Sequence, residues 1–381
     1  MLVISITLIV FLGFPVTIDR LEKKSRIIRW LSPIIVCYLA GILLGNIPGL
    51  NLNRELLNMI TGIAVFLAIP LLLFSSHFKK IIKQVKPALL AYFLGVAGLL
   101  ICVFLAFTIF REEVSKPEAV SGMLVGVYTG GTPNMSAIGL SLNVEEEVFI
   151  LLNSADIVFS GVYFVFLLTF GKHLLALFLP GSVKHNKTEL RELSQIQQYG
   201  IKKNISYIAA GFILSVLIFM LSTGFSWLIM KDWNMDNAVP YIILGITTLG
   251  IVASFHPNIR NLPHTYKTAN YLLLVFAMSM GALANFSELI ANSSVLFRFC
   301  GFVVFGSVTI HLLLAYLFKL DRDTVIIAST AAIFGPAFIG PVAKSIDNDE
   351  IITIGISLGL IGYAIGNYLG IGFALLLNNS W

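Results

Sequence analysis

The chain consists of long apolar segments separated by short polar ones. Ten of these segments are candidate membrane spans, and they lie at residues 2–17, 30–47, 59–75, 87–110, 148–179, 205–230, 240–255, 269–289, 296–318 and 351–377. A helix needs about 20 apolar residues to cross a hydrocarbon core of about 30 Å. The pattern therefore predicts ten spanning helices, five on each side of a polar segment at residues 181–203.

Two further apolar segments, at residues 119–142 and 324–345, are each interrupted by glycine, proline and small polar residues. The interruptions are Tyr-Thr-Gly-Gly-Thr-Pro-Asn-Met-Ser at residues 128–136 and Phe-Gly-Pro-Ala-Phe-Ile-Gly-Pro at residues 334–341. The arms on either side are too short to cross a membrane. Unwound backbone at membrane depth is tolerated only where protein or a water-filled cavity satisfies it. We therefore expect each segment to form a broken or re-entrant helical hairpin.

A constant offset relates the two halves of the chain. A distance of 203 residues separates three pairs of corresponding residues: Pro133 and Pro336, Glu147 and Glu350, and Ser154 and Ser357. Solenoid repeats are far shorter, so the offset indicates a two-fold duplication. We expect residues 1–180 to form a first membrane repeat, residues 181–203 a cytoplasmic linker, and residues 204–381 a second membrane repeat.

Basic residues cluster in three loops, near residues 20–29, 79–86 and 184–203. The positive-inside rule places such loops in the cytoplasm. All three share one side only if the first interrupted segment re-enters the membrane instead of crossing it. Five crossings per repeat then invert the second repeat and place both termini outside. The predicted fold is an all-α polytopic membrane protein with two inverted repeats, each of about five transmembrane helices and one hairpin.

Composition agrees with this class, because hydrophobic residues make up 57% of the chain and charged residues only 12%, and the mean hydropathy is +0.90. A soluble core does not account for these values. The net charge of +5 comes from short basic clusters, so it indicates orientation in the membrane and not a nucleic-acid partner. Cys37, Cys102 and Cys300 lie in apolar segments without metal-ligand spacing, so we expect them in the core.

Asp156 is the carboxylate placed well inside a long apolar segment. Such a group costs at least about 2.5 kcal/mol to insert and is expected to face a partner or a wet cavity. With Asn153 and Ser154 nearby, Asp156 is a candidate sodium ligand or proton carrier. The alternative is a structural acid that accepts a backbone N–H of the hairpin. His311 is also embedded and is a candidate partner of Asp156, although a lone histidine on an apolar helix is more often structural.

The interruptions supply most of the candidate substrate-binding residues. Unwound helix ends offer N–H groups, C=O groups and side-chain oxygens to a ligand. The alternative role of these serine, threonine and asparagine residues is capping of helix ends. The candidates are Thr129, Gly130, Gly131, Thr132, Asn134 and Ser136 from the first interruption, Gly335, Pro336 and Ala337 from the second, and Tyr363 and Asn367 from the last apolar segment.

Glycines recur at three- and four-residue steps along the last apolar segment, at Gly355, Gly359, Gly362, Gly366 and Gly370. Such spacing gives a narrow helix face that another helix or hairpin can approach closely. Tight packing alone does not account for Asn367, because a polar amide at that depth needs a partner. We therefore expect this helix to pack against the hairpins.

These motifs resemble a bacterial membrane family catalogued as domain of unknown function eight-one-nine. The resemblance rests on Gly-Gly-Thr-Pro-Asn at residues 130–134, Asp-Ile-Val at 156–158, Gly-Pro at 335–336 and Gly-Tyr-Ala-Ile-Gly-Asn-Tyr at 362–368, and it covers nearly the whole chain. That family is grouped with the cation/proton antiporter and anion transporter superfamily, which includes glutamate–sodium and 2-hydroxycarboxylate–sodium symporters. The resemblance implies a homodimer in the bacterial inner membrane, with a scaffold, a moving transport domain and a cation-coupled site between the interruptions. Phe338 and Ile339 are bulkier than the small residues expected of the family, so no substrate is carried over.

The sequence therefore favours a secondary active transporter, coupled to sodium or protons, that moves a small solute by an elevator-type mechanism. An organic anion or an amino-acid-like compound is the expected substrate, with a short peptide or another zwitterion as the alternative, since no lysine or arginine lies deep in a span. An intramembrane enzyme is the competing class, but the chain has neither His-Glu-x-x-His nor Gly-x-Ser-x-Gly. A non-transporting sensor is a third alternative. Apart from a sodium ion at Asp156, no cofactor is expected, and the surroundings are membrane lipid.

Overall fold

A computed structural model describes residues 2–22, 24, 33–48, 50, 52–74, 86–181, 205–230, 235–283 and 293–380. Every secondary-structure element within these ranges is helical, with no strand among them. Apart from residue 181, the predicted linker at residues 181–203 lies outside the described residues.

The helices lie at the predicted positions. In the first half they are α1 (Leu2–Glu22), α3 (Pro33–Gly45), α4 (Arg54–Phe74), α6 (Lys86–Phe110), α7 (Pro117–Gly130), α8 (Thr132–Ser141), α9 (Glu146–Phe166), the π-helix η1 (Leu167–Gly171) and α10 (Lys172–Leu175). In the second half they are α12 (Ile205–Ile229), α13 (Met235–Ser254), α14 (Pro257–Arg260), α15 (Thr265–Leu283), α17 (Ser293–Leu317), α18 (Arg322–Phe334), η2 (Pro336–Phe338), α19 (Ile339–Ser345), η3 (Asp349–Ile351) and α20 (Ile352–Ser380).

Some helix ends lie beyond the apolar segments that predicted them. Helix α1 continues from residue 17 to Glu22, and α4 begins at Arg54 instead of residue 59. Charged residues continue a helix well in its terminal turns, where their side chains reach water. Hydropathy therefore located the spans but not their exact ends.

Six described helices are long and apolar enough to cross a membrane: Arg54–Phe74, Lys86–Phe110, Glu146–Leu175, Ser206–Ile229, Ser294–Leu317 and Ile352–Asn378. Shorter apolar helices lie at Val36–Gly45 and Ala238–Ser254. Large apolar side chains such as Leu228, Ile9 and Leu43 are about 70% exposed on their outer faces, which suits contact with lipid. The protein is an all-α polytopic membrane protein, as the sequence predicted.

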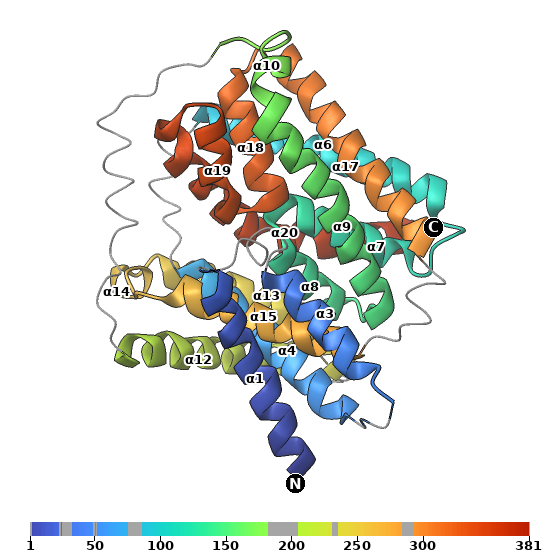
Figure 1. The fold of residues 1–381 in the computed structure, drawn as a ribbon, viewed down its shortest axis with the longest axis vertical. Helices are drawn as coiled ribbons and strands as arrows, with labels where there is room; N and C mark the ends of the chain where they lie inside the picture. Colours follow the sequence, from blue (N-terminus) through green and yellow to red (C-terminus); the bar gives the residue numbers. More distant parts are fainter. Residues whose placement is uncertain are drawn as a thin grey trace.

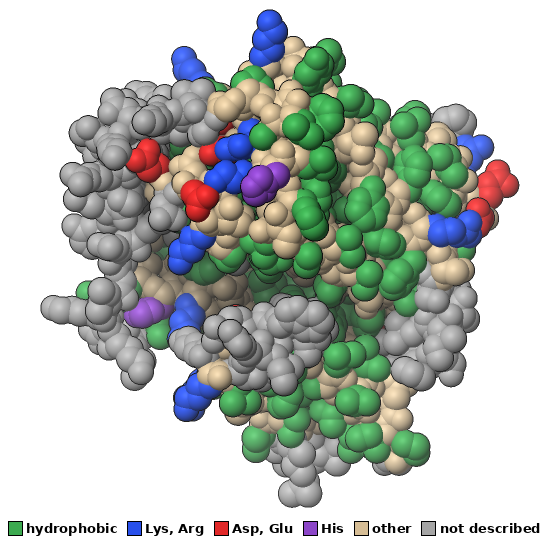
Figure 2. Space-filling view, turned by 45° about the horizontal axis from the view of Figure 1, so that its top comes forward, with side chains coloured by type: hydrophobic (Ala, Val, Ile, Leu, Met, Phe, Trp, Pro, Cys, Tyr) green, Lys and Arg blue, Asp and Glu red, His purple; other side chains and the backbone are tan. Residues whose placement is uncertain are grey.

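The helices pack in two groups, one above the other in Figure 1. In one group α15 packs against α3 and α4, and α12 packs against α13 and α4. In the other α17 packs against α6 and α9, and α20 packs against α7 and α18. Hydrophobic side chains cover much of the face in Figure 2, and that face is hollowed between an upper and a lower mass.

The backbone of the two interrupted segments repeats itself. Three pairs of residues with positive φ recur in the two halves, at Lys116 and Lys319, at Gly131 and Gly335, and at Asn143 and Asp347. The members of these pairs are 203, 204 and 204 residues apart. The hairpins thus share one backbone plan, as an internal duplication requires, whereas the inverted orientation of the repeats stays a prediction.

Candidate functional site

The first interruption is an antiparallel helical hairpin. Helix α7 ends at Gly130, Gly131 has φ +89°, and α8 begins at Thr132. Gly126 of α7 faces Ile138 of α8. At the open end, Lys116 Nζ donates to the carbonyl of Asn143 at 2.8 Å. Glycine suits the tip because an L side chain rarely adopts this φ.

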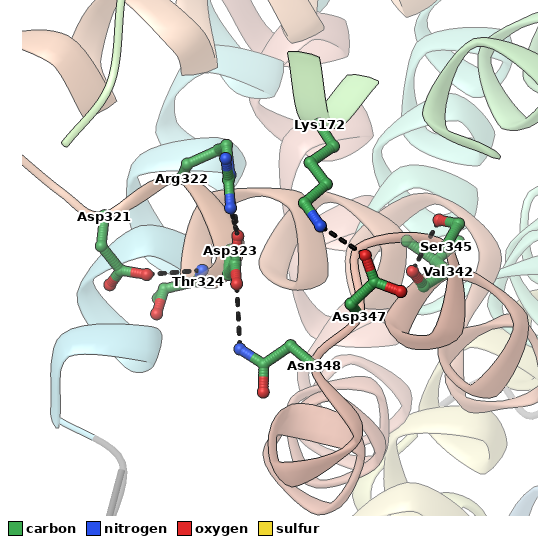
Figure 3. A network of polar contacts seen from close by, with 9 residues as sticks. All are labelled: Lys172, Asp321, Arg322, Asp323, Thr324, Val342, Ser345, Asp347 and Asn348. Carbon is green, nitrogen blue, oxygen red and sulfur yellow. Dashed lines mark hydrogen bonds and ion pairs between the residues drawn. The ribbon is translucent and has the colours of Figure 1, made fainter. Parts of the chain in front are cut away.

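The second interruption has the same construction. Helix α18 ends at Phe334, Gly335 has φ +72°, and η2 and α19 follow. At the open end, Asn348 Nδ2 donates to Asp323 Oδ2 at 3.0 Å, which joins the start of α18 to the segment after α19 (Figure 3). Hairpins were thus correctly predicted at both interruptions, although their re-entry into a membrane stays a prediction.

The open ends of the two hairpins lie at opposite ends of α9. That helix begins at Glu146, just after the first hairpin, and its extension through η1 reaches Lys172. Lys172 Nζ lies 2.6 Å from Asp347 Oδ2, at the open end of the second hairpin. The 30 residues from Glu146 to Leu175 correspond to about 45 Å of helix. The hairpins therefore enter the protein from opposite ends.

Charged residues fix the open end of the second hairpin (Figure 3). Asp321 Oδ1 caps α18 by accepting the backbone N–H of Thr324 at 3.0 Å, and Arg322 pairs with the buried Asp323 at 2.8 Å. The hydrogen bond from Lys172 lowers the pKa of Asp347 below its usual value. Because the Asp347 side chain is 81% exposed, water and salt screen this pair and its contribution to stability is small.

Both hairpin tips contact one aromatic side chain, Tyr363 of α20. A Cβ atom built on Gly131 would lie 3.8 Å from Tyr363 Cε1, and one built on Gly335 would lie 3.2 Å from Tyr363 Oη. Tyr363 itself is buried. The tips of both hairpins therefore meet at one ring, although Tyr363 is 232 positions from Gly131 in the sequence.

The glycine face of α20 packs against both hairpins, as predicted. Gly359 lies against Pro336 of the second hairpin, at 2.8 Å from a built Cβ to the proline ring. Gly362 lies against the carbonyl of Thr129, and Gly366 lies against the Asn134 side chain, both in the first hairpin. Side chains larger than hydrogen at these positions would push the hairpins away from α20.

The hydrogen bonds at the first tip involve amide, hydroxyl and backbone groups. Asn134 Nδ2 donates to the carbonyl of Gly362 at 3.0 Å, and the Tyr92 hydroxyl donates to the carbonyl of Thr129. The Thr129 hydroxyl is fully buried and has no hydrogen-bond partner among the described residues. Ser136 donates to the carbonyl of Thr132 at 2.9 Å, so its hydroxyl bonds within α8.

Asn367 has the partner that its depth requires, but this partner is not on a hairpin. Asn367 Nδ2 donates to Thr247 Oγ1 of α13 at 3.0 Å, and the neighbouring hydroxyls of Tyr368 and Thr248 lie 2.6 Å apart. The side chain of Asn367 is fully buried. It therefore connects α20 to the other group of helices through Nδ2, while its Oδ1 has no hydrogen-bond partner among the described residues.

Asp156 is buried, with 6% of its surface exposed. The hydroxyls of Tyr128, at the end of α7, and of Ser160, one turn along α9, are its side-chain hydrogen-bonding neighbours. The Tyr128 hydroxyl also lies 3.2 Å from Cys300 Sγ of α17. Asp156 Oδ1 has no hydrogen-bond partner among the described residues, and the same holds for Asn153 Oδ1.

The structure separates Ser154 from the other two predicted cation ligands. Ser154 Oγ donates to the carbonyl of Ile150 in its own helix at 2.7 Å. Residues 154 and 156 of an α-helix point about 160° apart, whereas residues 153 and 156 share a face. Asn153 and Asp156 therefore form the candidate pair.

A model of the family described as "Protein of unknown function (DUF819)" matches residues 6–380. The chain belongs to the DUF819 family. It is similar to the "Uncharacterized membrane protein YjcL" of Bacillus subtilis (strain 168), with 21% identity over 363 residues that cover 92% of this chain and 91% of the relative. The match extends over both hairpins and over α20, so the residues at the tips lie within the family region.

The bulky residues that depart from the expected family pattern pack against neighbouring helices. Phe338 lies against Phe164 of α9 and Phe334 of α18, with ring centroids 5.2 and 5.5 Å apart. Ile339 is fully buried, and its Cγ2 lies 2.7 Å from a Cβ built on Gly355. Pro336 contacts α20 as described above, and the side chain of Ala337 lies outside the described part of the chain.

His311 does not pair with Asp156. Its ring lies beside Gly95 of α6, at 3.2 Å from a built Cβ, and it bonds to the backbone of Ala91. This packing on a neighbouring helix agrees with the expected structural role, although Nε2 of the ring has no hydrogen-bond partner among the described residues.

Sequence reasoning missed the tyrosines that join the elements. Tyr92 bonds to the first tip, Tyr266 of α15 is a side-chain hydrogen-bonding neighbour of Tyr363, and Tyr163 of α9 lies 2.7 Å from Ser329 Oγ of α18. A tyrosine inside an apolar helix could have indicated these contacts, since a buried tyrosine hydroxyl usually has a hydrogen-bond partner. Among the residues that the structure describes, no group of three or more His, Cys, Asp or Glu residues could hold a metal ion.

Proposed function

We propose that the protein is a secondary active transporter that moves a small solute by alternating access, coupled to a proton or sodium gradient. One observation carries this proposal: two hairpins that enter the protein from opposite ends have their tips at the same residue, Tyr363. Transporters with inverted repeats place their binding sites between such discontinuous helices. Each hairpin connects the central site with one end of the protein, so opening of one or the other exposes the site to one side at a time.

The packing favours an elevator-type movement. The hairpins contact the glycine face of α20 closely, and we propose that they move with α20 as one body. The other group, formed around α3, α4 and α15, would serve as the scaffold and as the interface of a homodimer. Contacts between α20 and α13, such as Asn367 with Thr247, are hydrogen bonds between side chains. They would break and re-form during the movement.

We propose an organic anion or an amino-acid-like compound as the substrate, with a short peptide as the alternative. The amide and hydroxyl groups at the first tip can bind carboxylate or amide groups, and they include the Thr129 hydroxyl, which has no partner within the described residues. An intramembrane enzyme is disfavoured, because a pair of oppositely entering hairpins serves alternating access and has no evident role in hydrolysis. A sensor that keeps the fold without transport is the remaining alternative.

A solute screen tests the transport proposal. Purified protein is heated with organic acids, amino acids and dipeptides, and compounds that raise the melting temperature are offered to proteoliposomes with and without an ion gradient. We expect at least one stabilising compound to accumulate only when a gradient is present. Binding without accumulation under any gradient would favour the sensor.

Cysteine labelling tests the proposed topology, in which the protein lies in the inner membrane with both termini outside. In a background without the buried Cys37, Cys102 and Cys300, single cysteines replace Glu112, Glu145 and Lys344. An impermeant maleimide added to intact cells should label positions 112 and 145, near the first open end, but not position 344, near the second. Equal labelling of positions 112 and 344 would contradict entry of the hairpins from opposite sides.

A further inference from the structure

The surroundings of Asp156 supply hydrogen-bond donors and little that could bind a metal ion. Tyr128 faces the carboxyl group from α7, and Cys300 reaches it through Tyr128 from α17. On its own helix, Ser160 Oγ donates to the main-chain carbonyl of Asp156 at 2.5 Å. Asp156 forms no ion pair within the described residues. An ionised carboxylate would therefore remain without a counter-charge in a buried position, which is unfavourable.

The charged groups of the neighbouring helices point elsewhere. Arg298 of α17, two residues before Cys300, pairs at 2.7 Å with Glu113, which follows the end of α6. His311 lies on the same helix as Cys300 but bonds to α6. Tyr163, two turns along α9, bonds to Ser329. Among the described residues, the titratable groups that face Asp156 are thus Tyr128 and Cys300, and both are uncharged in their protonated forms.

Two buried acceptor atoms on one face of α9 lack a donor. Asp156 Oδ1 and Asn153 Oδ1 both have no hydrogen-bond partner in the described structure, and the two residues are 6% and 2% exposed. Residues three apart on a helix are surface neighbours, with Cβ atoms about 5–6 Å apart. A proton on Asp156 Oδ1 would turn this atom into a donor, and Asn153 Oδ1 could then accept it. One proton therefore satisfies both atoms.

A sodium ion fits this position less well. Hard cations bind several oxygen ligands at once, often including backbone carbonyls. Helix α9 is regular from Glu146 to Phe166, so its carbonyls are engaged in helical hydrogen bonds, and the carbonyl of Asp156 also accepts Ser160. Next to Tyr128 and Asp156 lies the thiol of Cys300, which is a soft ligand suited to other metals.

We propose that the coupling cation is a proton, which binds to Asp156 Oδ1 and is held there by a hydrogen bond to Asn153. This inference rests on the proposed function and specifies its ion. Protonation forms one O–H bond and removes the buried charge, and deprotonation returns the proton to water on the side to which the site is open. Tyr128, whose hydroxyl lies 3.2 Å from Cys300 Sγ, is a hydrogen-bonding neighbour of this carboxyl group and is a positioning residue.

Infrared spectroscopy of the reconstituted protein tests the proposal directly. We expect a C=O stretching band of a protonated carboxylic acid at neutral pH in sodium buffer. The band should disappear in Asp156→Asn and shift in Asn153→Leu, which removes the acceptor. Glu113→Gln, which removes an exposed and ion-paired carboxylate, should leave the band unchanged. Replacement of sodium by choline should alter neither the band nor the melting temperature.

The contrary results separate this inference from the proposed function. If no such band is found, and sodium raises the melting temperature of the parent but not of Asp156→Asn, then Asp156 binds sodium. In that case proton coupling is wrong and the transporter proposal stands. If Asp156→Asn changes neither the bands nor any ion response, the residue is structural and ion coupling through it fails. The solute screen then decides independently whether the protein transports.

Discussion

Replacement of Gly362 by alanine is expected to lower the free energy of unfolding by about 3 kcal/mol, the upper end of the usual cost of overpacking. A Cβ atom at this position would overlap the carbonyl oxygen of Thr129 and lie 2.7 Å from Tyr92 Oη and 3.0 Å from Gly130 Cα. Two of these three atoms belong to the backbone of the hairpin tip, which cannot rotate away. Relief of the overlap therefore requires the first hairpin to move away from α20.

The same helix provides matched controls. Gly372 has no atom within 4 Å of a built Cβ, so Gly372→Ala should be neutral or should stabilise α20 by up to about 1 kcal/mol through helix propensity. Gly366→Ala should fall between the two, because it meets the terminal amide of Asn134, which can rotate at the cost of its bond to Gly362. Thermal unfolding of the three variants measures the order. Equal melting temperatures for Gly362→Ala and Gly372→Ala would show that the first hairpin does not pack on this face.

The hairpins could be predicted because their signal is local. Glycine and proline in the middle of an apolar segment disfavour a continuous helix, and the breaks at Gly131 and Gly335 lie inside the predicted interruptions. The glycine face of α20 is equally local, since its spacing alone indicates close approach. The identity of the segments that pack against this face cannot be read from the local sequence.

The partners at the site could not be predicted, because they are distant in sequence. Asn134 bonds to a carbonyl 228 residues away, and Asn367 bonds to a threonine 120 residues away. The sequence indicated that a buried amide needs a partner but could not choose between a hairpin and α13. By contrast, the grouping of Ser154 with Asp156 could have been avoided, since helical periodicity alone places them on different faces.

Replacement of Tyr363 by alanine is expected to remove the common support of both hairpin tips. Loss of a large buried ring costs about 3–5 kcal/mol, and here the ring is the contact that Gly131 and Gly335 share. Local opening should therefore increase at two segments that are far apart in sequence. Hydrogen exchange measured by mass spectrometry should show faster exchange in peptides that cover both tips, and solute binding should weaken more than tenfold.

Tyr363→Phe separates the ring from its hydroxyl. The variant loses the hydroxyl, which is hydrogen-bonded to Tyr266 and is the Tyr363 atom nearest to Gly335. It keeps the aromatic ring, whose Cζ and Cε1 atoms lie 3.7 and 3.8 Å from a Cβ built on Gly335, so protection of both tips should stay close to that of the parent. Peptides from α3 should exchange at the parent rate in both variants, since Gly41 packs against α15 and not against α20. If Tyr363→Ala accelerates exchange at one tip only, the hairpins do not depend on a shared contact. The meeting of the two breaks at one residue would then carry no functional weight, and the transport proposal would lose the observation on which it rests.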